Sequence, residues 1–458
     1  MNRTYRTQHI WCTLAILVIT SLTVFARQSG TKELTLDGAI RIGLQKNKEL
    51  VAARFEVQRA DARVQEAFGT ALPSIDFSGR YTRALEKPVF FLPDFQNLGS
   101  GRTLPIRIGS DHSIDMTLSA RQILFNNAAF IGVGASKIYS EAARDLYQAK
   151  QLETVAKIRK AFYGALFASE AAEVMRANLK NAEENLRNVQ ALARQGIVSE
   201  YDQLRASVGV ENLRPIVIQA ENGYALALDG LKSAMGVEAS EQFFLSGGLA
   251  FTPIDESTLE AAQEEVLRAN PNLSAMRHQV EVNKAFKRVH ASDYLPTLAA
   301  FGNYQYQLAK NSLNISTADF KRSSLVGLSL TVNLFQGLQT NARVEQAHLE
   351  VRKSEEQLAN MEMNLRILVH SLTLQIRQSR QRVEAQGKTV EQAERGYKIA
   401  TSRFLNGSGT QLEVNDAQSA LNQARVNRMQ AIYDYLVAAA ELDQALGRGP
   451  VASSSTNN

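Results

Sequence analysis

The segment LPSIDFSGRY, from Leu72 to Tyr81, recurs as LPTLAAFGNY, from Leu295 to Tyr304, at a spacing of 223 residues. Further anchors with the same spacing lie upstream, at Leu36 and Leu259 and at Asn47 and Asn270. Self-similarity at a fixed spacing is typical of a chain that is built from repeated structural units. The sequence therefore predicts an internal duplication, in which each copy repeats the same order of elements.

Downstream of these anchors the spacing falls to 210 residues, where Leu124-Phe125 matches Leu334-Phe335, and it is then 211 residues, where Gly196 matches Gly407. The difference falls in a loop, where insertions are tolerated best. Each copy should contain a helix ending at Leu-Pro, a strand, a variable loop, a strand, a very long helix, a glycine turn and another helix. The predicted domains are a signal peptide (1–26), a first repeat (27–247), a second repeat (248–447) and a short polar tail (448–458).

Apolar and polar residues alternate in all four predicted strands, as period-two structure requires. The apolar positions are Ile75, Phe77, Gly79 and Tyr81; Ile114, Met116 and Leu118; Ala300, Gly302, Tyr304 and Tyr306; and Val326, Leu328, Leu330, Val332 and Leu334. This alternation fits membrane strands between lipid and an aqueous lumen, and it equally fits a soluble sandwich with one buried face. The long connections Leu85–Ser110 and Ala309–Arg322 favour membrane strands. On that interpretation Tyr81, Met116, Tyr304, Leu328 and Leu330 face lipid.

Two stretches without proline, about 128–195 and 342–405, predict very long helices. At 1.5 Å per residue the first would span roughly 100 Å. Both carry coiled-coil seams, with a four-residue step from Leu372 to Ile376 that locally relaxes the supercoil. The seam residues are Ala165, Ala168, Ala172, Met175, Leu179, Ala182, Leu186, Val189 and Ala193 in the first helix, and Val344, Val351, Leu358, Leu365, Leu372, Ile376, Val383, Val390, Tyr397 and Phe404 in the second.

The N-terminus predicts export. Arg3 and Arg6 precede an apolar stretch that ends at Ala26, which is the pattern of a secretory signal peptide. A membrane anchor is the alternative, although the stretch is short of the roughly 20 residues that a spanning helix needs. The only cysteine, Cys12, lies inside this segment, so cleavage would leave no thiol chemistry; lipidation at Cys12 stays open.

The rest of the sequence argues against an enzyme. The six histidines are scattered, Gly132-Val-Gly134-Ala-Ser-Lys137 lacks the spacing of a phosphate loop, and no nucleophile elbow is present. The net charge of +5 is spread along helical faces where acids alternate with bases, which excludes a patch for nucleic acid. We therefore predict no catalytic residues, no cofactor, no bound metal and no nucleic-acid partner.

Four strands cannot close a membrane barrel, for which about eight is the lower limit. The residue pattern alone allows two, three or four chains. Beyond that pattern, the sequence resembles the TolC-like outer-membrane factors of Gram-negative bacteria from about Leu34 to Gly447. The resemblance rests on the two Leu-Pro pairs, on Leu124-Phe125-Asn126 and Leu334-Phe335-Gln336, and on the turn segments Gly196–Asp202 and Gly407–Glu413, in this order.

The resemblance implies a mainly α-helical homotrimer whose chains share a 12-strand β-barrel in the outer membrane and a helical tunnel in the periplasm. Such a channel is the passive exit duct of a tripartite efflux pump or of a type I secretion system. Its expected partners are a periplasmic adaptor, an inner-membrane transporter and outer-membrane lipid. A periplasmic coiled-coil scaffold or adaptor is the alternative, and it leaves the duplicated strands unexplained.

The resemblance also implies a gate at the periplasmic entrance. Glu413 and Asp416 lie three residues apart, on one helix face, at positions where the family carries a ring of acids. Asp202 matches one partner of the family's latch. Phe404 and Gly409 stand where the family has a tyrosine and an arginine, so we expect packing or other contacts to hold this entrance.

Helix capping is a competing explanation for two of these acids. Thr410–Glu413 has the sequence of a capping box, and Ser199–Asp202 is a close variant. Asp416 has no capping role, which makes it the strongest gate candidate.

Overall fold

The computed structural model of the protein describes residues 32–93, 101 and 103–449. The predicted signal peptide and residues 450–458 of the predicted tail lie outside the described residues. The described chain is mainly helical. In chain order its elements are β1 (Lys32–Leu34), α2 (Leu36–Lys46), α3 (Lys48–Gly69), β2 (Ser74–Arg83), β3 (Val89–Pro93), β4 (Thr103–Arg107), β5 (His112–Phe125), α4 (Asn127–Arg194), α5 (Glu200–Met235), β6 (Phe243–Leu245), α6 (Glu256–Ala269), α7 (Pro271–Ala291), η1 (Ser292–Tyr294), β7 (Thr297–Lys310), η2 (Thr317–Asp319), β8 (Lys321–Thr331), α8 (Gln339–Leu405) and α9 (Gln411–Ala445).

The contacts divide the described residues into two compact units, and each unit draws on both halves of the sequence. One holds 32–46, 158–250 and 389–433. The other holds the described residues of 47–157, 251–388 and 434–449. The α4–α5 and α8–α9 turns both lie in the first unit, and the large sheet lies in the second. Each candidate site described below is therefore contained in one unit.

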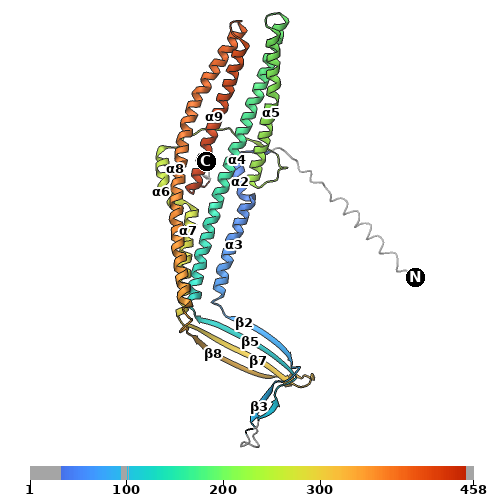
Figure 1. Ribbon diagram of the computed structural model, residues 1–458, viewed down its shortest axis with the longest axis vertical. Coiled ribbons are helices and arrows are strands. Elements are labelled where there is room, and N and C mark those ends of the chain that lie inside the picture. The colour runs from blue at the N-terminus through green and yellow to red at the C-terminus, as the bar shows by residue number, and fades with distance from the viewer. Residues whose placement is uncertain (1–31, 94–100, 102, 450–458) are drawn as a thin grey trace, which may run out of the picture. The chain divides into compact units, whose positions relative to one another are not determined.

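The second unit contains a four-stranded antiparallel sheet in the order β2-β5-β7-β8, whose strands run side by side in Figure 1. All four of its strands were predicted from the alternation. The predicted end of the last strand is wrong, because β8 stops at Thr331 and leaves Val332 and Leu334 outside it. The chain must turn there to enter α8, and Gly337 and Leu338 both take positive φ values in that turn.

Three features of the fold were missed by the sequence analysis. The predicted loop 85–110 contains a hairpin in which β3 pairs with β4. A short parallel pair joins β1 to β6. The helix expected before each Leu-Pro is two helices, because Asn47 and Asn270 interrupt it. Each asparagine side chain accepts a hydrogen bond from the backbone N–H three residues later, at 3.0 Å, which satisfies a donor of the new helix.

Both very long helices are present, as α4 and α8, close to their predicted bounds. Every residue of the two predicted seams is buried or half-buried, including Ala165 and Val189 of α4 at 0 % exposure. The seam of α8 stays buried across the four-residue step, since Leu372 and Ile376 are 2 % and 1 % exposed. The heptad prediction, with its stutter, is therefore confirmed.

The main core of the second unit lies where α6, α8 and α9 meet. It contains Leu259, Ala262 and Val266 of α6, Val369, Leu372 and Ile376 of α8, Tyr435, Ala438, Leu442 and Ala445 of α9, and Leu446 just after α9. Tyr435 is 1 % exposed, and its hydroxyl accepts from Ile254 N (2.8 Å) and donates to Thr252 O (3.0 Å). These bonds satisfy the buried hydroxyl and attach the segment before α6 to α9.

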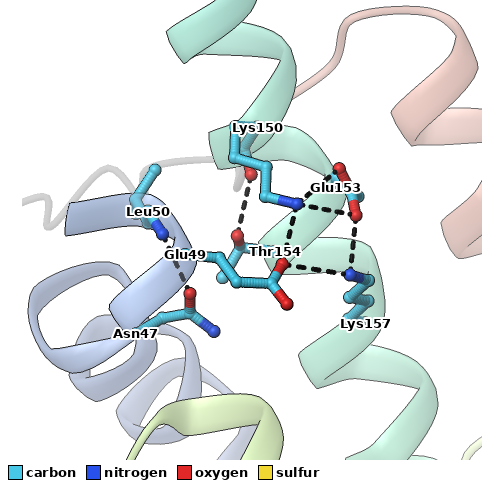
Figure 2. Close-up of polar contacts among 7 residues, drawn as sticks. All are labelled: Asn47, Glu49, Leu50, Lys150, Glu153, Thr154 and Lys157. Atoms are coloured by element: carbon cyan, nitrogen blue, oxygen red, sulfur yellow. Dashed lines mark hydrogen bonds and ion pairs between the residues drawn. The ribbon is translucent and has the colours of Figure 1, made fainter. Parts of the chain in front are cut away.

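A four-residue charge network attaches the start of α3 to α4. Figure 2 shows Glu49 reaching Lys150 and Lys157, at 2.7 and 3.4 Å. Glu153 accepts from the same two lysines, at 3.1 and 2.6 Å. The hydrogen bond between Lys150 and Glu49 lowers the pKa of the Glu49 carboxyl and raises the pKa of the Lys150 ammonium. Because the pKa of Glu49 is lower in the folded state, its stabilising contribution is present above the ordinary value of 4.5 and is lost as the pH falls.

The Glu49→Gln variant should therefore show less hydrogen-exchange protection of the α3 amides than the wild type at pH 7. The difference should shrink as the pH falls below 4.5, because the wild-type carboxylate then becomes protonated too. Glu66→Gln is the matched control on α3, since the described residues show no ion pair for Glu66. A difference that stays constant with pH would contradict the role of the network.

Candidate functional site

Two glycines build the turns that join the helical hairpins. Gly196 follows α4 and Gly407 follows α8, with φ of 74° and 69°. In both turns the next residue donates its N–H to a carbonyl five residues earlier, as Ser408 does to Arg403 (2.9 Å) and Ile197 does to Leu192 (3.0 Å). This is the left-handed helix ending that favours glycine. The two predicted glycine turns are thus confirmed.

Asp202, in the first turn of α5, completes a capping box with Ser199. The Asp202 N–H donates to Ser199 Oγ (3.2 Å), and Asp202 Oδ2 accepts from Ser199 N (3.3 Å) and from Ser199 Oγ (2.6 Å). Within the described residues this carboxylate has no hydrogen bond or ion pair with α9. Its observed role is to start α5.

Glu413, in the first turn of α9, forms only half of its predicted box. Its N–H donates to Thr410 Oγ1 (3.2 Å), whereas its carboxylate lies 3.6 Å from the guanidinium of Arg403. Arg403 also donates to Ser408 O (3.1 Å), and Ser408 Oγ donates back to Arg403 O (3.2 Å). The end of α8, the turn and the start of α9 are therefore held together through one arginine.

Arg403 was not singled out from the sequence. The sequence feature that could have identified Arg403 is its position in the last turn of the predicted helix. Basic side chains at such positions commonly reach the final carbonyls of the helix. Its neighbour Phe404 is half-buried at the end of the α8 seam. At Gly409 a Cβ atom would lie 3.0 Å from Arg403 Cβ and 3.1 Å from Phe404 N, so this turn has little room for a side chain at position 409. The cation of this turn comes from position 403 instead.

Asp416 is exposed, one helical turn after Glu413. The part of the chain that the structure describes gives its carboxylate no hydrogen bond and no ion pair. Of the three candidate acids, Asp202 is engaged in capping and Glu413 is paired with Arg403. Asp416 alone presents its charge to solvent without a protein partner among the described residues.

The seam of α9 next to this turn contains buried amides alongside the apolar residues Val414 and Leu421. Gln411 donates to Asn415 (3.0 Å) and Gln418 donates to Asn422 (3.1 Å), and Gln411 and Asn422 are only 4 % and 7 % exposed. A cavity of about 240 Å³ lies beside the seam, lined in part by asparagines of α4 and α5: Asn178, Asn181, Asn185 and Asn212. Water can replace amide hydrogen bonds at little net cost. The amides of this stretch hydrogen-bond within α9 beside a cavity, while Val414 and Leu421 supply the apolar contacts.

The four-stranded sheet has one apolar face. Residues paired across antiparallel strands point to the same side, and successive residues alternate. The pairs Met116–Tyr306, Ala300–Leu328 and Leu298–Leu330 place these strands in one register. All five residues predicted to face lipid, Tyr81, Met116, Tyr304, Leu328 and Leu330, consequently lie on this face, together with Ile75, Phe77, Ile114, Leu118, Leu308 and Val326.

The opposite face is polar over most of its area and is called the polar face below. It carries Ser74, Asp76, Ser78, Arg80 and Thr82 of β2; Ser113, Asp115, Thr117, Ser119 and Arg121 of β5; Asn303, Gln305 and Gln307 of β7; and Lys321, Ser323, Ser329 and Thr331 of β8. In the described ranges, no group of three or more histidine, cysteine or acidic side chains is arranged to hold a metal ion. No helix among the described residues is long and apolar enough to cross a membrane.

The sequence matches a known protein family and characterised relatives. The family model described as outer membrane efflux protein matches residues 39–237 and 262–448. The alkaline protease secretion protein AprF of Pseudomonas aeruginosa is 25 % identical over 71 % of this chain and 68 % of its own length. The outer membrane protein TolC of Vibrio cholerae is 24 % identical over 71 % of this chain and 75 % of its own length.

Solved structures share the fold. The outer-membrane channel OprN superposes with a TM-score of 0.74 at 18 % identity, covering 90 % of both chains. The outer membrane channel CmeC of Campylobacter jejuni gives a TM-score of 0.72 at 17 % identity, covering 90 % of this chain and 86 % of its own. The long helices and the four-stranded sheet together are thus a known arrangement.

Proposed function

Because the chain belongs to the outer membrane efflux protein family, we propose that three copies of it assemble into one passive duct. The protein is an outer-membrane channel for efflux or secretion that extends into the periplasm. In the proposed assembly each chain adds four strands to a shared barrel of twelve in the outer membrane, and its long helices line a tunnel in the periplasm. In this proposal the duct is passive, and the energy for transport comes from a partner.

The observation that carries the assembly is the open sheet, and the number of three copies rests on the resemblance to the family. Its outer strands, β2 and β8, each have one edge unpaired within the described chain, and exposed strand edges tend to pair with further strands. Pairing β8 of one copy with β2 of the next would remove every edge of the sheet. Four strands are too few for closure and twelve lie inside the observed range of outer-membrane barrels. The apolar face then contacts lipid and the polar face lines the lumen.

We also propose that the chain arose by duplication, with repeats at 27–247 and 248–447. The matching elements support this in detail. Asn47 and Asn270 cap α3 and α7 in the same way, and Gly196 and Gly407 end α4 and α8 with the same turn. The two compact units do not argue against it, because duplicated hairpins that pack side by side mix both repeats in each unit.

At the periplasmic entrance we propose that Asp416 and Glu413 form an acidic ring, with six carboxylates in three copies. In this proposal Asp202 borders the ring, and its carboxylate contributes by capping the start of α5. Arg403 neutralises part of the ring by its pairing with Glu413 and holds the turn closed. Phe404 adds packing at the end of the α8 seam, and Gly409 leaves space for the Arg403 side chain.

The proposed partners are a periplasmic adaptor and an inner-membrane transporter, together with outer-membrane lipid. They follow from the kind of channel, because a passive duct needs an energised transporter at its inner end. The family match favours this function over the alternative of a periplasmic scaffold, for which the apolar sheet face would have no use.

Native mass spectrometry of protein extracted from outer membranes tests the assembly, and single-channel recording in a planar bilayer tests the duct. We expect a trimer and discrete, cation-selective conductance steps. A folded monomer would contradict the assembly. A trimer without conductance, recovered from soluble periplasm, would support the scaffold instead.

The Arg403→Gln variant should strengthen block by trivalent cations roughly two- to fivefold, because it releases Glu413 from an exposed pair worth at most about 1 kcal/mol. The same substitution in a Glu413→Gln background should have a smaller effect, since the carboxylate through which Arg403 acts is then gone. Arg395→Gln is the matched control, because Arg395 pairs with Glu391 on α8 at 2.9 Å away from the turn. Equal effects of Arg403→Gln in both backgrounds would show that Arg403 does not act through Glu413.

A further inference from the structure

The apolar face of the sheet ends in a row of basic residues at its loop side. Arg83 ends β2, His112 begins β5 and Lys310 ends β7, and the register pairs Arg83 with His112 and His112 with Lys310. Arg322, the second residue of β8, pairs with Tyr306 on the same face. These four residues are called the basic rim. Neighbouring strands lie about 4.8 Å apart, so Arg83 and Lys310 are separated by roughly 10 Å.

The charges of the four-stranded sheet are divided unequally between its two faces. Its acidic residues, Asp76 and Asp115, both lie on the polar face, where Arg80 pairs directly with Asp115. The ionisable bases of the apolar face are the basic rim, and no acidic residue of the four strands lies on that face. The two cations Arg83 and Lys310 therefore flank the imidazole of His112 on one face of the sheet.

The contacts inside the rim leave much of this charge unopposed. Lys310 pairs with Asp319 of the neighbouring loop at 2.8 Å. Arg83 and Arg322 are exposed, and the described residues provide no carboxylate within ion-pair distance of either. His112 is 7 % exposed, and its Nδ1 lies 2.9 Å from the Tyr81 hydroxyl. When Tyr81 donates this hydrogen bond, the hydrogen of His112 is on Nε2, which can then donate to an anion.

Aromatic residues lie on the same face just inside the rim. The ring of Tyr81 stacks on that of His112, and the rings of Tyr304 and Tyr306 meet at 5.4 Å. Aromatic girdles mark the level of the headgroups on outer-membrane barrels. The basic rim therefore lies at or beyond the headgroup level, next to the phosphates of lipids.

We propose that the basic rim binds phosphorylated lipid headgroups of the membrane leaflet on the loop side. The phosphate oxygens would lie between Arg83, Lys310 and Arg322, with His112 as a further donor, while the acyl chains contact the apolar face. This inference rests on the lipid-facing assignment in the proposed function. It adds a ligand class and a site, because apolar contact alone would select no headgroup.

The alternating faces of the strands provide a matched pair of variants. Arg83→Gln with Arg322→Gln removes two charges from the rim. Arg80→Gln with Lys321→Gln removes two charges from the same two strands on the polar face. The full-length trimer in detergent is incubated with bis-phosphorylated lipid A and with the same lipid A after removal of its phosphates, and native mass spectrometry measures the retained lipid.

We expect the rim variant to bind bis-phosphorylated lipid A about thirtyfold more weakly than the wild type, since each of its two lost basic residues contributes roughly fivefold near a membrane surface. The polar-face variant should bind like the wild type, and lipid A without phosphates should bind weakly to all three proteins. Trimer assembly is confirmed in the same spectra.

Several results would overturn the inference. Equal losses in both variants would indicate bulk charge, and no loss in the rim variant would exclude the site. Equal retention of the dephosphorylated lipid would show that acyl chains suffice, and full competition by millimolar inorganic phosphate would show a free-phosphate site. If arginine at Leu328 is tolerated, the lipid-facing assignment itself is wrong; if it is not tolerated and the rim variant binds normally, only this inference fails.

Discussion

The Leu328→Arg variant is expected to fail in membrane insertion and trimer assembly, at a penalty of about 2–4 kcal/mol for each copy of the chain. Leu328 lies in the middle of the second half of β8, pairs with Ala300 and is 68 % exposed on the apolar face. A guanidinium there would have to leave water for hydrocarbon, with no carboxylate of the four strands on that face to pair with. Three copies place three such charges in one barrel, so the defect should be nearly complete.

Ser329→Arg is the matched control, because Ser329 is the next residue of β8 and lies on the polar face. We expect this variant to form trimers in wild-type amounts, with a change in conductance rather than in assembly. The measurement is the trimer fraction in outer-membrane extracts by native mass spectrometry. Equal assembly defects in the two variants would favour a soluble sandwich over a membrane sheet.

The second large effect is expected at the helical turn. Replacing both acids, Glu413→Gln with Asp416→Asn, should remove most of the cation selectivity and weaken block by a trivalent cation about tenfold or more. A trivalent ion gains about 3 kcal/mol from each carboxylate at 4 Å even in bulk water, and six such carboxylates are lost in the trimer. Reversal potentials and block constants in a planar bilayer measure both quantities.

Asp202→Asn provides the contrast for this experiment. It should weaken the start of α5 only slightly, because the asparagine oxygen can still accept from the Ser199 N–H, and it should leave selectivity close to the wild type. Unchanged selectivity and block in the double variant would remove the gate assignment, although the channel function would stand. A selectivity change in Asp202→Asn as large as in the double variant would show that this acid also faces the pathway.

The long helices and their heptad seams were predictable because many residues of the sequence follow the same spacing. Ten seam positions of α8 must fall on one stripe, and a four-residue step such as Leu372 to Ile376 is visible against that regularity. The strands were similarly defined by alternation. Their register was not predictable from single strands, yet it decides that Tyr81 and Leu328, from opposite ends of the sheet, share a face.

Features that depend on a single side chain escaped prediction. The break at Asn47 leaves the helical periodicity intact on both sides, so the cap was invisible until its hydrogen bond to Leu50 was seen. Arg403 resembles any other base at a helix end, and only the geometry of the turn brings it to Glu413. The β3–β4 hairpin lies in a stretch with proline and glycine, which indicates a loop to any pattern-based interpretation.

The amide seam of α9 has a consequence for how the channel responds to temperature. Separating this part of α9 from its surroundings exposes the amides of Gln411, Gln418 and Asn422 together with the apolar side chains of Val414 and Leu421. Hydration of polar surface lowers the heat capacity, whereas hydration of apolar surface raises it, by roughly −0.26 and +0.45 cal/mol/K per Å². Opening at this end should therefore carry a heat-capacity change close to zero. The equilibrium between closed and open entrances would then follow a nearly straight van't Hoff line, so that one enthalpy of opening holds across the range of temperatures at which the cell grows.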